Sequence, residues 1–141
     1  MDKLEILKTF IGKEFSGSPS PFMRWLNPTV ISAEEGHLEF QYTVRQEWLN
    51  PMGNLHGGVT AAIFDDIIGA TMFSLNENNF IVTVNNSIDY FSTAKENETI
   101  IAETKIIKRG KQFVNAECEI WNSDKTRLIA RGTSNLFKIN N

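Results

Sequence analysis

The chain has 141 residues, close to the size of one average domain, and a chain of this length can bury enough surface to form one hydrophobic core. Its composition is 41% hydrophobic and 22% charged, which is ordinary for a globular protein and excludes wholesale disorder. The formal net charge of −3 argues against a nucleic-acid-binding protein, which usually carries a basic excess.

No segment has the features of a membrane span or of an export signal. The longest run without Asp, Glu, Lys or Arg, residues 48–64, is interrupted by Asn, His and Gly, whereas a transmembrane helix needs about 20 mostly apolar residues. The single cysteine, Cys118, excludes an intrachain disulfide and a multi-thiolate zinc site. We therefore expect a cytoplasmic protein, without membrane association, that forms one domain over residues 1–141.

Hydrophobic periodicity predicts a helix, two strands, a central helix and four more strands, in that order. The expected elements are a helix at about 2–15, two strands within 29–44, a helix at 57–76, and strands at 80–91, 98–108, 112–121 and 126–139. Residues 17–21, Gly-Ser-Pro-Ser-Pro, are expected to be a connector without regular structure. The short turns between the later strands favour hairpins and hence an antiparallel sheet.

The predicted central helix is apolar on almost every side, so its surroundings must bury it. A curved antiparallel sheet of about six strands could wrap around it. The expected fold class is therefore α+β, with one central helix inside a curved sheet and an extra N-terminal helix.

Asp65 and Asp66 are the only charged residues between Val59 and Leu75. Burying an unpaired carboxylate costs free energy, so each acid must reach solvent, find a partner or shift its pKa. Adjacent helical residues point about 100° apart, so the two acids can have different surroundings. One acid could cap a neighbouring loop while the other meets solvent, but two adjacent acids favour a functional role for at least one of them.

Two glycines, Gly57 and Gly58, stand where the central helix begins, after Asn50 and His56 in the preceding loop. The free N–H groups of a first helical turn, together with the helix dipole, form a site for an oxyanion or a carbonyl oxygen. The glycines could instead only permit a tight turn, and His56 alone could be an ordinary loop histidine. Combined with a carboxylate two turns further along, the arrangement favours acyl transfer to water.

The sequence lacks the usual motifs of other hydrolases and of metal sites, and it contains one short cluster of basic residues. The sequence has no Gly-X-Ser-X-Gly motif, two distant histidines do not build a His-rich metal site, and Cys118 is expected in the core. Four of the 14 basic residues lie within seven positions around a turn at Gly110: Lys105, Lys108, Arg109 and Lys111. This cluster is either a solvated hairpin end or a site for phosphate groups, and it is too small to indicate DNA or RNA.

The segment Asn50-Pro-Met-Gly-Asn-Leu-His-Gly-Gly-Val-Thr-Ala-Ala-Ile-Phe-Asp65 resembles the Asn…Gly…His-Gly-Gly…Asp signature of the PaaI-like acyl-CoA thioesterases. The resemblance continues through 82–94, 108–111 and 130–133 and covers about residues 28–138. It implies the hotdog fold, in a homodimer or a dimer of dimers with the active site at the dimer interface. The implied reaction is hydrolysis of an acyl-CoA to free acid and CoA, without a metal or any cofactor beyond the CoA of the substrate.

The resemblance also implies roles for individual residues. The Gly57 N–H would polarise the thioester carbonyl, and His56 and Asn50 would position substrate or water. Asp65 of the facing subunit would be the general base or the nucleophile, with Thr83 facing it. The residues implied to bind CoA are Gly58, Tyr90, Lys108, Arg109, Gly110 and Lys111.

Two alternatives to a thioesterase stay open. A non-catalytic acyl-CoA-binding module would have lost the acid or the oxyanion glycines, and both are present here. A hotdog hydratase or dehydratase would pair a histidine with an acid at a spacing that this sequence lacks. The acyl group, the choice between dimer and tetramer, and the role of Asp66 do not follow from the sequence.

Overall fold

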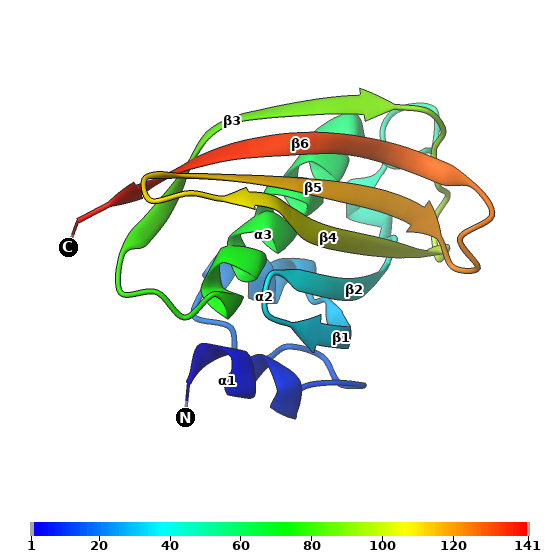
Figure 1. Cartoon of the computed structure of the whole chain (residues 1–141). Helices are drawn as coiled ribbons and strands as arrows, with labels where there is room; N and C mark the ends of the chain where they lie inside the picture. The colour runs from blue at the N-terminus through cyan, green and yellow to red at the C-terminus, as the bar shows by residue number, and fades with distance from the viewer. Residues whose placement is uncertain (1, 141) are drawn as a thin grey trace.

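In the computed structural model, which describes residues 2–140, a six-stranded antiparallel sheet arches over one long helix (Figure 1). The strands are β1 (Thr29–Glu34), β2 (His37–Thr43), β3 (Phe80–Tyr90), β4 (Thr99–Arg109), β5 (Phe113–Asn122) and β6 (Leu128–Ile139). The helices are α1 (Lys3–Thr9), α2 (Pro21–Leu26), the short 3-10 helix η1 (Gln46–Trp48) and α3 (Gly57–Ser74). The strand order is β1-β2-β4-β5-β6-β3. The predicted fold class is confirmed.

The first helix is shorter than predicted. α1 ends at Thr9, whereas the apolar periodicity continues to about residue 15. Beyond the helix, Ile11 forms a β-bridge with Val30, and Gly12 adopts a positive φ of 83° that ends any helical continuation. The later apolar residues of this segment therefore pack as a loop against β1 and do not extend α1.

The predicted connector at residues 17–21 leads directly into a helix, α2. Its start is defined by Ser20, whose side chain accepts a hydrogen bond from the Met23 N–H, and by Pro21 at the first helical position. A serine cap with proline after it is a helix-start pattern, and not only a break in regular structure. The prediction of an irregular connector was therefore wrong at Pro21, which begins the helix.

The core lies between α3 and the concave face of the sheet. Side chains of α3 that are completely buried include Ile63, Phe64, Ile67 and Ile68. Cys118 faces them from β5 and is also buried, as predicted, and burial raises the pKa of its thiol. Each large apolar side chain buried in this way contributes about 1.5–3 kcal/mol. Among residues 2–140, no helix is long and apolar enough to cross a membrane.

β3 is held against β6 at a position that only glycine can occupy. Gly132 of β6 is paired with Ile88 of β3, and a Cβ atom added at Gly132 would lie 2.0 Å from the Ser87 carbonyl oxygen. Because that contact is with backbone, a side chain could fit only if β3 itself moved. Gly132 therefore fixes how closely the edge strand β3 approaches the rest of the sheet.

Gly132→Ala is expected to lower the free energy of unfolding by about 1–3 kcal/mol, the usual cost of forced overpacking. Gly69→Ala is the matched control, because an added Cβ at this exposed position in α3 meets nothing within 4 Å. Alanine is favoured over glycine in a helix by about 1 kcal/mol, so the control is expected to be stabilised. Denaturant unfolding of both variants measures the difference, and a fully stable Gly132→Ala variant would contradict the observed β3–β6 contact.

Candidate active site

Asp65 is an exposed residue of α3 that faces β3 and accepts two hydrogen bonds from it. Thr83 Oγ1 donates from 3.1 Å and Asn86 Nδ2 from 2.9 Å, both to Asp65 Oδ1. Thr83 thus lies where the sequence predicted, whereas Asn86 was not among the predicted site residues. Because both bonds go to Oδ1, the carboxylate is oriented and Oδ2 remains for a water molecule or a substrate.

A β-bulge brings Thr83 and Asn86 to the same side of β3. Successive strand residues point to opposite faces, so residues 83 and 86 would ordinarily lie on opposite sides of the sheet. The β3–β6 register shifts between Thr83 and Asn85, and the extra residue, Val84, reverses the alternation. Under strict alternation, Asn86 would point away from α3, which is why the sequence did not indicate it.

The loop histidine and the two glycines cap the start of α3. His56 is the N-cap residue, and its Nδ1 accepts a hydrogen bond from the Gly58 N–H at 2.8 Å. Among the described residues, the exposed Gly57 N–H has no hydrogen-bond partner, and it stands at the positive end of an 18-residue helix. Of the two glycine donors, Gly57 is therefore the one that can bind an oxygen of a ligand. Tyr90 lies beside it, and its hydroxyl donates to the Gly57 carbonyl from 3.0 Å.

Asn50 shapes the loop that leads into α3. Its Oδ1 accepts hydrogen bonds from the N–H groups of Met52, at 2.9 Å, and of Asn54, at 3.1 Å. The carbonyl end of the side chain is thus used within the loop, and the amide NH₂ is the part that can contact a ligand.

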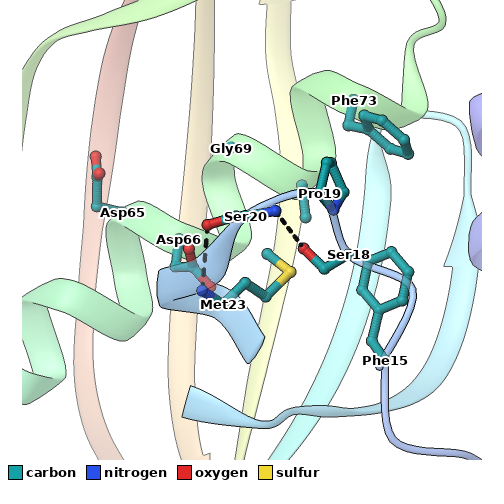
Figure 2. Close-up of a pocket in the computed structure, with 10 residues that line it drawn as sticks. Phe15, Ser18, Pro19, Ser20, Met23, Asp65, Asp66, Gly69 and Phe73 are labelled. Carbon is teal, nitrogen blue, oxygen red and sulfur yellow. Dashed lines mark hydrogen bonds between the residues drawn. The ribbon is translucent and has the colours of Figure 1, made fainter. Parts of the chain in front are cut away.

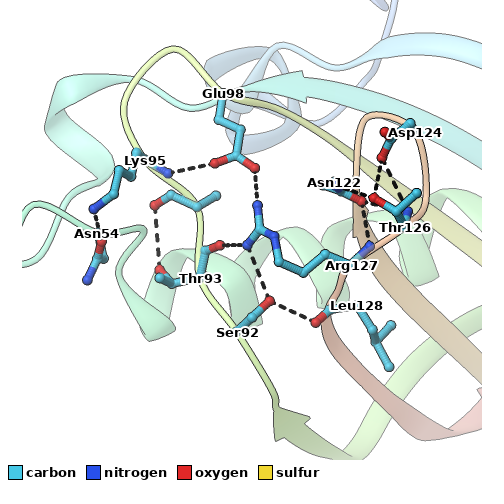
Figure 3. Close-up of polar contacts among 11 residues, drawn as sticks. Asn54, Ser92, Thr93, Lys95, Glu98, Asn122, Asp124, Thr126, Arg127 and Leu128 are labelled. Atoms are coloured by element: carbon cyan, nitrogen blue, oxygen red, sulfur yellow. Dashed lines mark hydrogen bonds and ion pairs between the residues drawn. The ribbon is translucent and has the colours of Figure 1, made fainter.

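A polar clasp holds this loop against the connection between β3 and β4 (Figure 3). Lys95 Nζ donates to Asn54 Oδ1 at 3.1 Å. Arg127, just before β6, donates to the Thr93 carbonyl and forms an ion pair with Glu98. These side chains come from distant parts of the sequence, and no motif indicated them. They fix the connection, and through Asn54 they help to fix the loop that precedes Gly57.

Within a single chain, the Asp65 carboxylate and the Gly57 N–H are too far apart to act on one thioester. Asp65 is eight residues after Gly57, which corresponds to about 12 Å along the helix axis at about 1.5 Å per residue. Eight steps of about 100° also place the two residues about 80° apart around the helix. A catalytic base and an oxyanion donor must each lie about 3 Å from the reacting atoms. Asp65 and the Gly57 N–H of one chain therefore cannot both contact the same thioester.

The residues predicted to bind CoA fall into two places. Tyr90 and Gly58 are at the start of α3, whereas three residues line a cavity of about 470 Å³ at the turn between β4 and β5: Lys108, Gly110 and Lys111. The turn lies near the C-terminal end of α3, because Arg109 donates to the Leu75 carbonyl there. The length of α3, about 27 Å, therefore separates the two places within one chain.

Arg109 already has partners within the chain. Its guanidinium forms ion pairs with Glu35 and Glu77, both at 3.0 Å, and donates to the Leu75 carbonyl. Each nitrogen of the guanidinium thus already donates a hydrogen bond. Arg109 fastens the turn to the end of α3, and its contact with CoA stays a prediction.

Asp66 points away from Asp65, into a cavity of about 240 Å³ between α3 and residues 15–23 (Figure 2). Burial, and then the neighbouring charge of Asp65, raises the pKa of Asp66 to about 7. Its Oδ2 is buried and has no hydrogen-bond partner in the described part of the chain.

Within residues 2–140, no group of three or more His, Cys, Asp or Glu side chains is arranged to hold a metal ion.

Comparison with known proteins identifies the family. The family model described as the thioesterase superfamily matches residues 52–129, more than half of the chain. Human acyl-coenzyme A thioesterase 13 is 32% identical over 104 residues, which cover 74% of this chain and 74% of the human protein. The chain belongs to the thioesterase superfamily.

Solved structures agree with the fold of this thioesterase. Escherichia coli PaaI is similar with a TM-score of 0.80 at 22% identity, covering 86% of each chain. A Streptococcus mutans protein solved with bound acetyl CoA is similar with a TM-score of 0.75 at 25% identity, covering 81% of this chain and 90% of that chain. The hotdog fold and the likeness to PaaI-like thioesterases, both expected from the sequence, are confirmed.

Proposed function

We propose that this thioesterase hydrolyses acyl-CoA thioesters to the free acid and CoA, in a site formed by two copies of the chain. The observation that carries the proposal is the pair of groups on α3: a Gly57 N–H without a partner among the described residues, and an oriented carboxylate at Asp65. The similarity to human acyl-coenzyme A thioesterase 13 and to a protein solved with acetyl CoA supports the substrate class.

The Gly57 N–H polarises the thioester carbonyl. Attack on the carbonyl carbon places negative charge on its oxygen, and a preorganised donor at the positive end of a helix stabilises that charge. The hydrogen bond from the Gly58 N–H to His56 Nδ1 leaves the proton of the neutral imidazole on Nε2, where it can be donated to substrate or water. His56 therefore both caps the helix and positions the reacting groups.

Asp65 Oδ2 supplies the base or the nucleophile. In the water route, a water oxygen attacks the carbonyl carbon while Asp65 takes its proton, and the proton passes to the sulfur as the carbon–sulfur bond breaks and CoA leaves. In the direct route, Asp65 Oδ2 attacks the carbonyl carbon, the carbon–sulfur bond breaks, and CoA leaves as a thiolate that takes a proton from solvent; water then hydrolyses the resulting anhydride to the free acid and restores Asp65. In both routes the hydrogen bonds from Thr83 and Asn86 hold the carboxylate in place, and CoA, as part of the substrate, is the only cofactor-like group required.

The exposed edge of β3 is where the second copy binds. β3 is an edge strand of 11 residues that carries exposed apolar side chains at Phe80, Val82 and Val84. A long unpaired edge with exposed apolar side chains favours pairing with another strand. The other edge strand, β1, is only six residues long and contacts the N-terminal segment.

A two-fold axis at β3 determines which residues face one another. In an antiparallel pair of identical strands, the numbers of opposite residues have a constant sum. Within one chain, the Gly57 carbonyl accepts a hydrogen bond from the Tyr90 hydroxyl, and Asp65 accepts hydrogen bonds from residues 83 and 86. Bringing Tyr90 of one copy opposite residues 83–86 of the other requires an axis at about residue 87. The same axis carries the turn with Lys108 and Lys111 toward the other copy's Gly57, where these lysines can contact CoA phosphates.

Asp65→Asn is expected to lower kcat by a factor of at least ~10², because the amide neither accepts a proton from water nor attacks a carbonyl. The measurement is release of free thiol from a panel of aromatic and straight-chain acyl-CoAs. Glu119→Gln, which alters an acid in β5 away from both groups, is the control and should retain wild-type activity. Near-full activity of Asp65→Asn would contradict the mechanism. Binding of acyl-CoAs without hydrolysis by the wild type would favour the non-catalytic module.

Ser87→Cys is expected to form a disulfide between two copies under mild oxidation. Directly opposite residues on antiparallel strands have Cα atoms about 4.5–5.5 Å apart, a separation that a disulfide spans. Cys118 is fully buried, so the new thiol is the accessible one. Phe80→Cys is the control. Phe80 lies seven residues from the axis, so the two Phe80 residues of the dimer are about 14 residues, or about 46 Å, apart along the strand direction. On a non-reducing gel, cross-linking of Phe80→Cys in place of Ser87→Cys would contradict the proposed pairing.

A further inference from the structure

A cavity lined in part by Asp65 lies between two parts of the chain that are distant in sequence (Figure 2). One wall is α3, from Asp65 to Phe73, and the other is the segment that carries Phe15 and Met23. Its volume is about 240 Å³, whereas a cavity of about 150 Å³ already holds benzene. The cavity is therefore large enough for a group of about six to eight carbon atoms attached to a thioester at Asp65.

Asp66, which lines this cavity, has a buried carboxyl oxygen without a hydrogen-bond partner among the described residues. The hydroxyl oxygens of Ser18 and Ser20 accept hydrogen bonds from backbone N–H groups of their own segment. Asp66 differs, because its Oδ2 is buried and has no hydrogen-bond partner among the described residues. A buried polar atom without a partner costs free energy unless a water molecule or a ligand supplies the missing bond.

We propose that this cavity receives the acyl group and that Asp66 selects acyl chains with a hydroxyl group far from the thioester over plain hydrocarbon chains of equal length. The proposal rests on the proposed function. A hydroxyl both donates and accepts, so it can pair with the carboxyl in either protonation state. A hydrocarbon chain in the same place removes water from the carboxyl and offers no replacement.

Few charged or titratable groups face Asp66. On α3 its neighbour is Asp65, and on β2 it is the Tyr42 hydroxyl, which is buried and has no partner among the described residues. α2 carries one charged side chain, Arg24, and its guanidinium donates to the Ser18 carbonyl at 2.6 Å. With burial and Asp65 raising the pKa of Asp66 to about 7, the ionised form increases as the pH rises through that value. The ionised carboxyl is costlier to cover with hydrocarbon, so selection should strengthen with rising pH.

The test compares kcat/KM for hexanoyl-CoA and 6-hydroxyhexanoyl-CoA. The wild type is expected to favour the hydroxyacyl substrate by about tenfold or more, and more strongly at about pH 8 than at about pH 6. Asp66→Asn, which keeps a donor and an acceptor in place, is expected to keep the preference without its pH dependence. Asp66→Leu, similar in size but apolar, is expected to abolish or reverse the preference.

Three results would overturn the selection by Asp66: equal kcat/KM values in the wild type, an unchanged preference in Asp66→Leu, or an unchanged pH dependence in Asp66→Asn. The last applies even if Asp66→Leu does not fold, because asparagine is nearly isosteric with aspartate. If the wild type hydrolyses neither substrate but does hydrolyse other acyl-CoAs of the panel, the selection alone is overturned, whereas failure on every acyl-CoA would overturn the proposed function as well. Hydrolysis of both at equal efficiency would overturn the selection alone.

Discussion

α3 is apolar on nearly every side, and its enclosure is the constraint on which the rest of the structure depends. The helix buries its central side chains, among them Ile63, Phe64 and Ile67, completely. Eighteen helical residues need a wide and curved sheet to cover them. The sheet leaves two polar parts of the helix exposed, namely its first turn with Gly57 and the side that carries Asp65. Hydrophobic burial thus determines where chemistry can take place.

A rigid helix keeps these two places about 12 Å apart, which is too far for one thioester. In the proposed dimer, a second copy bound at β3 resolves the separation, and β3 has two functions. Its inward side chains Thr83 and Asn86 orient Asp65, and its exposed edge, which carries apolar side chains, is where we propose that the second copy binds. The tight contact at Gly132 positions both functions at once, because it fixes the strand that carries them.

The sequence predicted what local patterns determine, namely the succession of the strands along the chain, the buried central helix, and the placement of Gly57 and Thr83. It did not predict what depends on distant parts of the chain. Asn86 joins the site only because a bulge at Val84 reverses the strand alternation. Arg109 is held by two glutamates that are remote from it in sequence. The surroundings of Asp66 are formed by residues 15–23, whose fold over α3 no periodicity indicates.

Mixing two inactive variants tests the central claim, that each site takes Asp65 from one copy and the Gly57 N–H from the other. Gly57→Pro removes the N–H at a helical position that suits proline, the preceding His56 is already extended, and an added Cβ meets Tyr90 at an ordinary 3.7 Å. When Gly57→Pro and Asp65→Asn are refolded together, about half of the dimers are mixed, and each has one intact site of two. Recovery of about a quarter of the wild-type activity is therefore expected. If tagged copies confirm mixed dimers and the mixture stays as inactive as either variant, the shared site is contradicted.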